Sequence, residues 1–162
     1  MPLQKIGFGG GCHWCTEAYF QSLRGVEKVE QGWIASNPPN EAFSEAVIVH
    51  YNPQIIPLKI LIAIHLHTHA ATRKHHFREK YRSAVYVFDG NIQEAETLIQ
   101  EHQSDFAEPL ITQVLPFAAF KENTETYQNY FQKNSEGAFC KTYILPKLKM
   151  MEAEYAAYFG PE

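Results

Sequence analysis

Apolar and polar residues alternate at the start of the chain in a way that predicts a strand, a turn and a helix in succession. Residues 3–8 alternate with the two-residue period of a strand. Three consecutive glycines, Gly9 to Gly11, interrupt this pattern, and in residues 12–23 the apolar side chains recur at helical spacing. Gly25 then suits the end of the helix, because glycine readily adopts the backbone conformation that follows a last helical turn.

The rest of the pattern contains short strands and helices in mixed order. Residues 45–51 are apolar on both faces, which is typical of a central strand. Pro57 suits the first turn of a helix that extends to about residue 67. The polar residues 67–80 predict an irregular connection. The other predicted strands cover residues 26–34, 83–88 and 111–115, and the other predicted helices cover residues 93–106, 122–133 and 145–158.

The order of these elements indicates an α+β protein. The first six follow the order β-α-β-β-α-β, which contains a hairpin-like pair of strands. That order favours a two-layer α/β sandwich with a ferredoxin-like core over a doubly wound sheet. The later elements add C-terminal helices and a loop-rich C-terminal tail. Because the chain has 162 residues and shows no repeat or long linker, we expect one domain covering residues 1–162.

The composition excludes several classes of function. The net charge is −4 at pH 7, and Glu79 interrupts the densest basic stretch, residues 73–82, so the sequence predicts no nucleic-acid surface. The most apolar run, residues 55–66, includes Lys59 and is too short to span a bilayer. The start of the chain carries no signal-peptide pattern, so we expect a cytoplasmic location. Three cysteines are too few for a disulfide scaffold, which leaves catalysis, metal binding or burial as their roles.

Cys12 combines the features of a reactive thiol. It follows a predicted strand and three glycines, which allow a tight turn and the close approach of a ligand. It also opens a predicted helix, where free N–H groups and the positive end of the helix dipole are found. Such a position lowers the pKa of a thiol and stabilises the thiolate, which is the nucleophilic form.

The spacing of Cys12 and Cys15 leaves other interpretations open. Both could be small core residues, since free cysteines are often buried and inert. They could form the C-x-x-C pair of a disulfide oxidoreductase, although Trp14 lies between them rather than before the first cysteine. A His-rich metal-binding module is a third possibility, because five of the eight histidines fall between His65 and His76.

The segment Gly10-Gly11-Cys12-His13-Trp14-Cys15 resembles the active-site signature of the A-type peptide methionine sulfoxide reductases. Further segments similar to that family follow in its order, namely Glu45-Ala46-Val47 with Tyr51-Asn52-Pro53, Tyr81-Arg82-Ser83-Ala84, and Lys133-Asn134 with Gly137 and Cys140. The resemblance spans roughly residues 6–147, nearly the whole chain. Four segments in order are specific, and the chain is identified as a divergent member of this family.

The resemblance implies a reaction and the roles of three residues. Cys12 matches the thiolate that attacks the sulfur of methionine-S-sulfoxide, peptide-bound or free, and becomes a sulfenic acid. Glu45 matches the acid that gives a proton or a strong hydrogen bond to the sulfoxide oxygen. Tyr81 matches a tyrosine that also hydrogen-bonds this oxygen. Their spacing alone would favour a solvated carboxylate for Glu45 and a half-buried tyrosine for Tyr81.

The resemblance also implies which residues bind the substrate. Trp14 matches the aromatic wall that holds the S-methyl group, where sulfur–aromatic contact is favourable. His13 and Phe43 are expected to line the same site. A core tryptophan is the alternative interpretation of Trp14.

A second cysteine is implied for recycling. Cys140 matches the residue that forms a disulfide with Cys12, which thioredoxin then reduces by thiol exchange. Cys15 is the alternative, although a Cys12–Cys15 bridge would distort the first turn of a well-formed helix. No metal or organic cofactor is implied, and we expect a monomer.

Several positions depart from the family's pattern, and they cluster around the expected site. The stretch between Trp33 and Glu45 is shorter than usual and lacks the family's second tyrosine. The substituted positions are His13 in place of Phe, Phe43 in place of His, His76 in place of Asp, and Tyr127 in place of His. We therefore infer that the sulfoxide chemistry persists while the rate or the preferred substrate differs, so that another small methyl sulfoxide is an alternative substrate.

Overall fold

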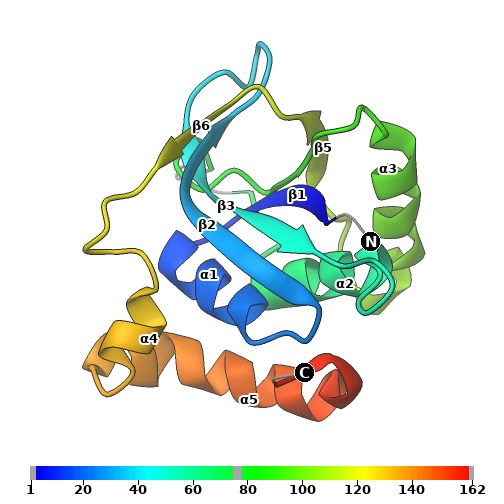
Figure 1. Ribbon diagram of the computed structural model, residues 1–162. Helices are drawn as coiled ribbons and strands as arrows, with labels where there is room; N and C mark the ends of the chain where they lie inside the picture. The colour runs from blue at the N-terminus through cyan, green and yellow to red at the C-terminus, as the bar shows by residue number, and fades with distance from the viewer. Residues whose placement is uncertain (1–2, 75–77, 161–162) are drawn as a thin grey trace.

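A six-stranded mixed sheet forms the centre of the computed structural model, which describes residues 3–74 and 78–160 (Figure 1). The order across the sheet is β5-β4-β1-β3-β2-β6. Neighbouring strands are antiparallel, except for the parallel pair of β4 and β5. The strands are β1 (Gln4–Gly9), β2 (Val26–Ala35), β3 (Ser44–Tyr51), β4 (Ala84–Val87), β5 (Gln113–Pro116) and β6 (Ala119–Glu122).

The helices connect the strands and extend the chain beyond the sheet. Figure 1 shows α4 and α5 beyond α1, on the side away from the sheet. Within residues 3–74 and 78–160, no helix combines the length and the apolar character needed to cross a membrane. The helices are α1 (His13–Gln21), α2 (Leu58–Thr68), α3 (Ile92–Glu101), α4 (Tyr130–Asn134) and α5 (Leu145–Glu154), with a π-helical turn at Cys140–Ile144 and 3-10 turns at Gln103–Asp105 and Ala156–Tyr158.

The α+β class predicted from the sequence is confirmed. Strands β4, β1, β3 and β2 lie side by side and are joined through α1 and α2, an order compatible with the predicted ferredoxin-like core. Strand β3 lies between β1 and β2, so its position at the centre of the sheet is also as predicted. The C-terminal helices follow β6.

The main core lies between the sheet and the helices. Phe8 of β1 stacks on Phe20 of α1 with ring centroids 4.7 Å apart, and both side chains are fully buried. The apolar side chains of α2, among them Leu61 and Ile64, belong to the same cluster. Each such side chain contributes roughly 1.5–3 kcal/mol by leaving water. This packing fixes α1 against β1, and Cys12 lies in the connection between these two elements.

The helix predicted over residues 122–133 is wrong for most of its length. Residues 119–122 form β6, and only Tyr130–Asn134 is helical. The reason is a set of tertiary hydrogen bonds, because the side chain of Gln128 accepts from the backbone N–H of Gln31 and donates to its carbonyl oxygen. Asn129 then adopts a left-handed φ of 56°, which asparagine tolerates better than most residues. These contacts outweigh the local helix propensity.

Candidate active site

Cys12 is the N-cap residue of α1. Its backbone is extended, with φ −60° and ψ 126°, and helical geometry begins at His13. The preceding turn needs glycine at position 10, because φ is +152° there and a Cβ atom would lie only 2.4 Å from the His69 ring. Arg78 donates to the carbonyl oxygen of Gly10 at 2.7 Å and ties the loop after α2 to this turn. His69 and Arg78 therefore hold the turn at Gly10, which leads directly into Cys12.

The surroundings of Cys12 favour the thiolate. Its pKa is lowered first by the neighbouring Cys15 thiol and then by the backbone N–H groups of Trp14 and Cys15. Burial and the charge of Glu45 act in the opposite direction. Because the helix N-terminus concentrates unpaired N–H groups, it is a suitable place for a negative sulfur.

Cys15 and Cys140 lie near this sulfur. The pKa of Cys15 is strongly raised, because its thiol donates to the Cys12 thiolate and because it is partly buried. Cys140 is fully buried at the start of the π-helical turn, close enough to Cys15 to raise the pKa of Cys15 further. All three cysteines are free thiols. The nearest thiol to Cys12 is thus Cys15, and Cys140 lies on a helical turn rather than in a loop.

Glu45 is placed next to Cys12 by the start of β3. Its side chain is 10% exposed, and its Oε1 accepts from the backbone N–H of His13 at 3.2 Å. Its Oε2 lies 3.7 Å from Nζ of Lys80. Sequence reasoning found Glu45 but missed Lys80, since nothing in the local pattern indicates that an exposed loop lysine faces the acid.

The backbone on either side of Tyr81 is hydrogen-bonded to the start of β3. Glu45 N–H donates to the carbonyl oxygen of Lys80 at 2.9 Å, and Ser44 Oγ donates to this oxygen as well. The backbone N–H of Arg82 donates to Ser44 Oγ at 2.7 Å. Lys80 Nζ lies 5.0 Å from the centre of the Tyr81 ring. These bonds hold residues 80–82 beside the acid.

The His13 side chain is buried next to Glu45 and does not line an exposed surface. The side chain is 5% exposed, and its Nδ1 is 2.7 Å from the Gly32 carbonyl oxygen. Its Nε2 is 3.6 Å from Glu45 Oε1 and 3.4 Å from the amide nitrogen of Asn123. Asn123 was missed because it lies in the segment predicted to be helical.

An aromatic group surrounds Trp14. Its ring stacks on Tyr130 at a centroid distance of 4.2 Å and on Tyr127 at 5.3 Å, and the edge contact with Phe139 is 5.4 Å. All three partners come from the chain between β6 and Cys140. Phe43, which lies two residues before Glu45, is 47% exposed and free to contact a ligand.

Two histidines of the histidine-rich segment, His65 and His69, form hydrogen bonds within the fold. His65 donates from Nε2 to the Gly9 carbonyl oxygen at 2.7 Å, and His69 Nε2 lies 2.7 Å from Ser83 Oγ. Across residues 3–74 and 78–160, no three His, Cys, Asp or Glu side chains are arranged to hold a metal ion. His75 and His76 lie outside the described residues, and so does the departure from the family's pattern at His76.

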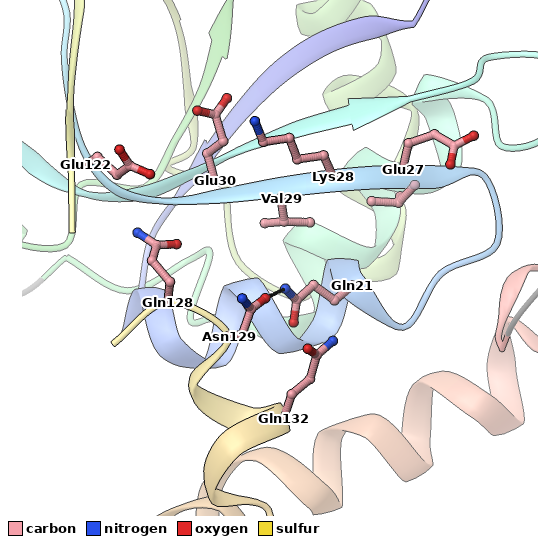
Figure 2. A pocket seen from close by; sticks show the side chains of 10 residues that line it. Gln21, Glu27, Lys28, Val29, Glu30, Glu122, Gln128, Asn129 and Gln132 are labelled. Carbon is pink, nitrogen blue, oxygen red and sulfur yellow. Dashed lines mark hydrogen bonds between the residues drawn. The ribbon is translucent and has the colours of Figure 1, made fainter. Parts of the chain in front are cut away.

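A polar groove of about 450 Å³ opens along β2, between this strand and the segment before α4 (Figure 2). Figure 2 shows the side chain of Gln21 pointing to Asn129, its hydrogen-bond partner at 2.7 Å. None of the residues that line the groove is predicted to belong to the active site. The groove is therefore separate from the site at Cys12.

A thiolate at a helix N-terminus, beside a buried carboxylate and a second thiol, defines a site for thiol redox chemistry. Comparison with known proteins agrees with this class. Residues 4–158 match the family described as peptide methionine sulfoxide reductase. The chain therefore belongs to the peptide methionine sulfoxide reductase family.

Individual relatives cover the chain almost completely. It is 31% identical to the peptide methionine sulfoxide reductase MsrA of Psychrobacter sp. (strain PRwf-1), over 98% of this chain and 99% of the relative. It is 32% identical to the MsrA of Deinococcus radiodurans, over 91% of this chain and 80% of the relative. Its fold resembles methionine sulfoxide reductase A of Corynebacterium diphtheriae, with a TM-score of 0.71, 22% identity and coverage of 84% and 77%.

Proposed function

We propose that this chain is a peptide-methionine (S)-S-oxide reductase, which reduces methionine-S-sulfoxide in proteins or free in solution. The observation that carries the proposal is the Cys12 thiolate at the start of α1 with Glu45 next to it. The names of the relatives, which share 31% and 32% of their aligned residues with this chain, support the same reaction.

The first step uses Cys12 and Glu45. The Cys12 thiolate attacks the sulfoxide sulfur, and the sulfoxide oxygen takes a proton from Glu45, because without it the oxygen is a poor leaving group. The sulfur–oxygen bond then breaks. The hydroxyl group moves from the methionine sulfur to the Cys12 sulfur as the transient sulfur–sulfur bond breaks, so methionine leaves and Cys12 becomes a sulfenic acid. Two electrons pass from the cysteine to the substrate, and one proton is consumed.

The substrate is held by groups on both sides of the thiol. We assign Tyr81 to the sulfoxide oxygen, since residues 80–82 are fixed beside Glu45. Trp14 and its stacked tyrosines supply an apolar surface for the S-methyl group. Phe43 is exposed and would contact the neighbouring part of the substrate.

Recycling requires a second thiol, and we propose that Cys15 and Cys140 act in turn. The sulfenic acid of Cys12 condenses with the Cys15 thiol, which is close enough to shift the pKa of Cys12, and releases water. A bridge here needs little distortion, because Cys12 is the N-cap and only Cys15 is helical. The Cys140 thiol then attacks the Cys15 sulfur of this disulfide, so that a Cys15–Cys140 disulfide forms and the Cys12 thiol is released.

Thioredoxin is the proposed final reductant. A yeast relative of similar fold, Mxr1, has been solved in complex with Trx2, with a TM-score of 0.62 and 21% identity. We place the reaction in the cytoplasm, where reduced thioredoxin is available. The main core joins residues from Ile6 to Met151, which supports the proposal of one domain. We propose that it acts as a monomer.

A disulfide oxidoreductase is the second candidate, favoured by the effect of the Cys15 thiol on the pKa of Cys12. Another small methyl sulfoxide remains the alternative substrate, because His13 and Tyr127 alter the surroundings of the thiol. One assay separates these functions. Turnover of resolved S and R sulfoxides, peptide-bound and free, is measured with dithiothreitol and then with thioredoxin.

The proposed function predicts S-selective turnover with both reductants. Cys140→Ser should keep activity with dithiothreitol and lose most of it with thioredoxin. Disulfide reduction without sulfoxide turnover would favour the second candidate, and turnover confined to small sulfoxides would favour the alternative substrate.

A further inference from the structure

We propose that Lys80 and Lys121 form a cationic rim beside Cys12, which selects methionine sulfoxides that carry a carboxylate close to the sulfoxide. This carboxylate is the side chain of an aspartate or glutamate next to the oxidised methionine in a peptide, or the α-carboxylate of the free amino acid. The inference rests on the proposed function, since it names the substrates that the same site prefers. It concerns specificity and adds no step to the reaction at sulfur.

Three neighbouring strands place one residue each in a row at the end of the sheet next to Cys12. Trp33 of β2 is paired with Glu45 of β3 on one side and with Lys121 of β6 on the other. Side chains of directly paired residues lie on the same face of a sheet. This is the face covered by α1, because the His13 ring is in edge contact with Trp33 at 5.1 Å. The backbone of Lys121 therefore lies two strand spacings, or about 10 Å, from that of the acid.

The Lys121 side chain extends over this row. Its Nζ lies 5.6 Å from the centre of the Trp33 ring, and the residue is exposed. In the part of the chain that the structure describes, no carboxylate forms an ion pair with Lys121. Its acidic neighbour, Glu122, lines the groove along β2 instead (Figure 2). The Lys121 ammonium is thus available to an anionic ligand.

Lys80 meets the same acid from the loop before β4. Its Nζ is 3.7 Å from Glu45 Oε2, which is longer than a hydrogen bond, so the ammonium keeps donors for a ligand. The lysine side chain is 61% exposed and the carboxylate side chain 10%, so an arriving substrate meets the lysine first. The pKa of Lys80 is raised, first by the Tyr81 side chain and further by the charges of Glu45 and Cys12, so Lys80 is positive at neutral pH.

The expected size of the effect follows from the exposure of both ammonium groups. An exposed ion pair changes an affinity by up to about fivefold. The net charge of −4 opposes an acidic peptide at long range, but physiological salt screens charges beyond about 8 Å. Residues next to a bound methionine sulfoxide fall inside that distance, because an extended chain advances about 3.5 Å per residue. The two lysines therefore outweigh the overall charge.

The test compares three peptides of one sequence in which methionine-S-sulfoxide is flanked on both sides by glutamate, by glutamine or by lysine. Methionine formation at limiting substrate gives one rate for each peptide. The ratio of the glutamate peptide to the lysine peptide is taken within each protein, so that a general loss of activity does not move it. For the wild type we expect a ratio of about tenfold at low salt, falling below about threefold in about 0.5 M NaCl.

Lys80→Gln and Lys121→Gln should each lower this ratio about two- to fivefold, and the double variant should bring it close to one. Lys5→Gln is the matched control, because Lys5 lies over the Phe88 ring at 5.3 Å near the start of β1, away from Cys12. It should keep the wild-type ratio. N-acetyl-methionine-S-sulfoxide and its amide test the other source of the carboxylate. Faster reduction of the acid than of the amide, lost in the double variant, assigns the α-carboxylate to the rim.

Equal rates in the wild type, both for the glutamate and lysine peptides and for the acid and its amide, would overturn the inference. So would a preference that the double variant retains in full. If the wild type forms no methionine from any of these substrates, the proposed function itself fails. If the double variant does not fold, Lys121→Glu takes its place. Its ratio should fall below that of Lys121→Gln, and a ratio equal to that of the wild type contradicts the proposal.

Discussion

At the scale of single residues, the reactivity of this protein depends on a few short contacts around Cys12. The Cys15 thiol and the backbone N–H groups of Trp14 and Cys15 all lower the pKa of Cys12. Cys12 and Glu45 are predicted from the sequence because a signature motif surrounds each of them, and Glu45 accepts a hydrogen bond from the residue after Cys12. Lys80 and Asn123 are not predicted, because they meet the site only through the folded path of distant segments.

The contact between the two sulfurs gives a direct prediction. Cys15→Ala removes the hydrogen bond to the thiolate, so the pKa of Cys12 should rise. The rate of alkylation of Cys12 by iodoacetamide, measured against pH, should show its midpoint at higher pH than in the wild type. Cys140→Ala is the control and should leave the midpoint in place. An unchanged midpoint in Cys15→Ala would mean that the helix N-terminus alone stabilises the thiolate.

At the scale of elements, the segment from β6 to α4 is the part that the local sequence pattern misrepresents. Its apolar spacing predicts a helix, but the segment instead binds along β2 and α1. Glu17 is the anchor, because its buried carboxylate accepts from Gln31 Nε2 at 2.9 Å and from the backbone N–H groups of Asn129 and Tyr130. Hydrogen bonds between residues about a hundred positions apart cannot be recognised from periodicity.

Glu17→Gln should loosen this segment. An amide at position 17 cannot accept all three hydrogen bonds, and leaving buried donors unpaired costs about 1–3 kcal/mol. We expect a lower free energy of unfolding in urea and faster proteolysis between residues 123 and 139. Glu125→Gln, at an exposed position of the same segment, is the control. Equal rates of proteolysis in the two variants would show that Glu17 does not hold this segment in place.

At the scale of the whole molecule, the α+β class could be predicted from the succession of elements, whereas the burial of His65 and His69 could not. His65 lies near the end of a predicted helix and His69 in a predicted irregular connection, yet their ring centroids are 4.2 Å apart and both rings lie against the glycine turn. Burial lowers the pKa of His65 to about 4 and that of His69 well below its usual value. Both rings are therefore neutral in the folded protein near neutral pH.

This burial predicts how stability depends on pH. The unfolded chain binds protons at these histidines below about pH 6.5 and the folded chain does not, so stability should be lost as the pH falls from about 6.5 towards 4. The shift at His65 corresponds to about 3 kcal/mol. Urea unfolding at pH 7 and pH 4.5 should show a smaller difference for His65→Gln than for the wild type. His67→Gln, which changes a partly exposed histidine, should behave like the wild type.

The nucleophile assignment is tested most directly by one measurement on Cys12→Ser. Without reductant, wild-type protein mixed with the S epimer of methionine sulfoxide should form methionine in a rapid phase of about one equivalent per enzyme before thiols are exhausted. Cys12→Ser should form none, with dithiothreitol or with thioredoxin. Methionine formation by Cys12→Ser at a measurable rate would contradict the central claim that the thiolate at the start of α1 attacks the sulfoxide.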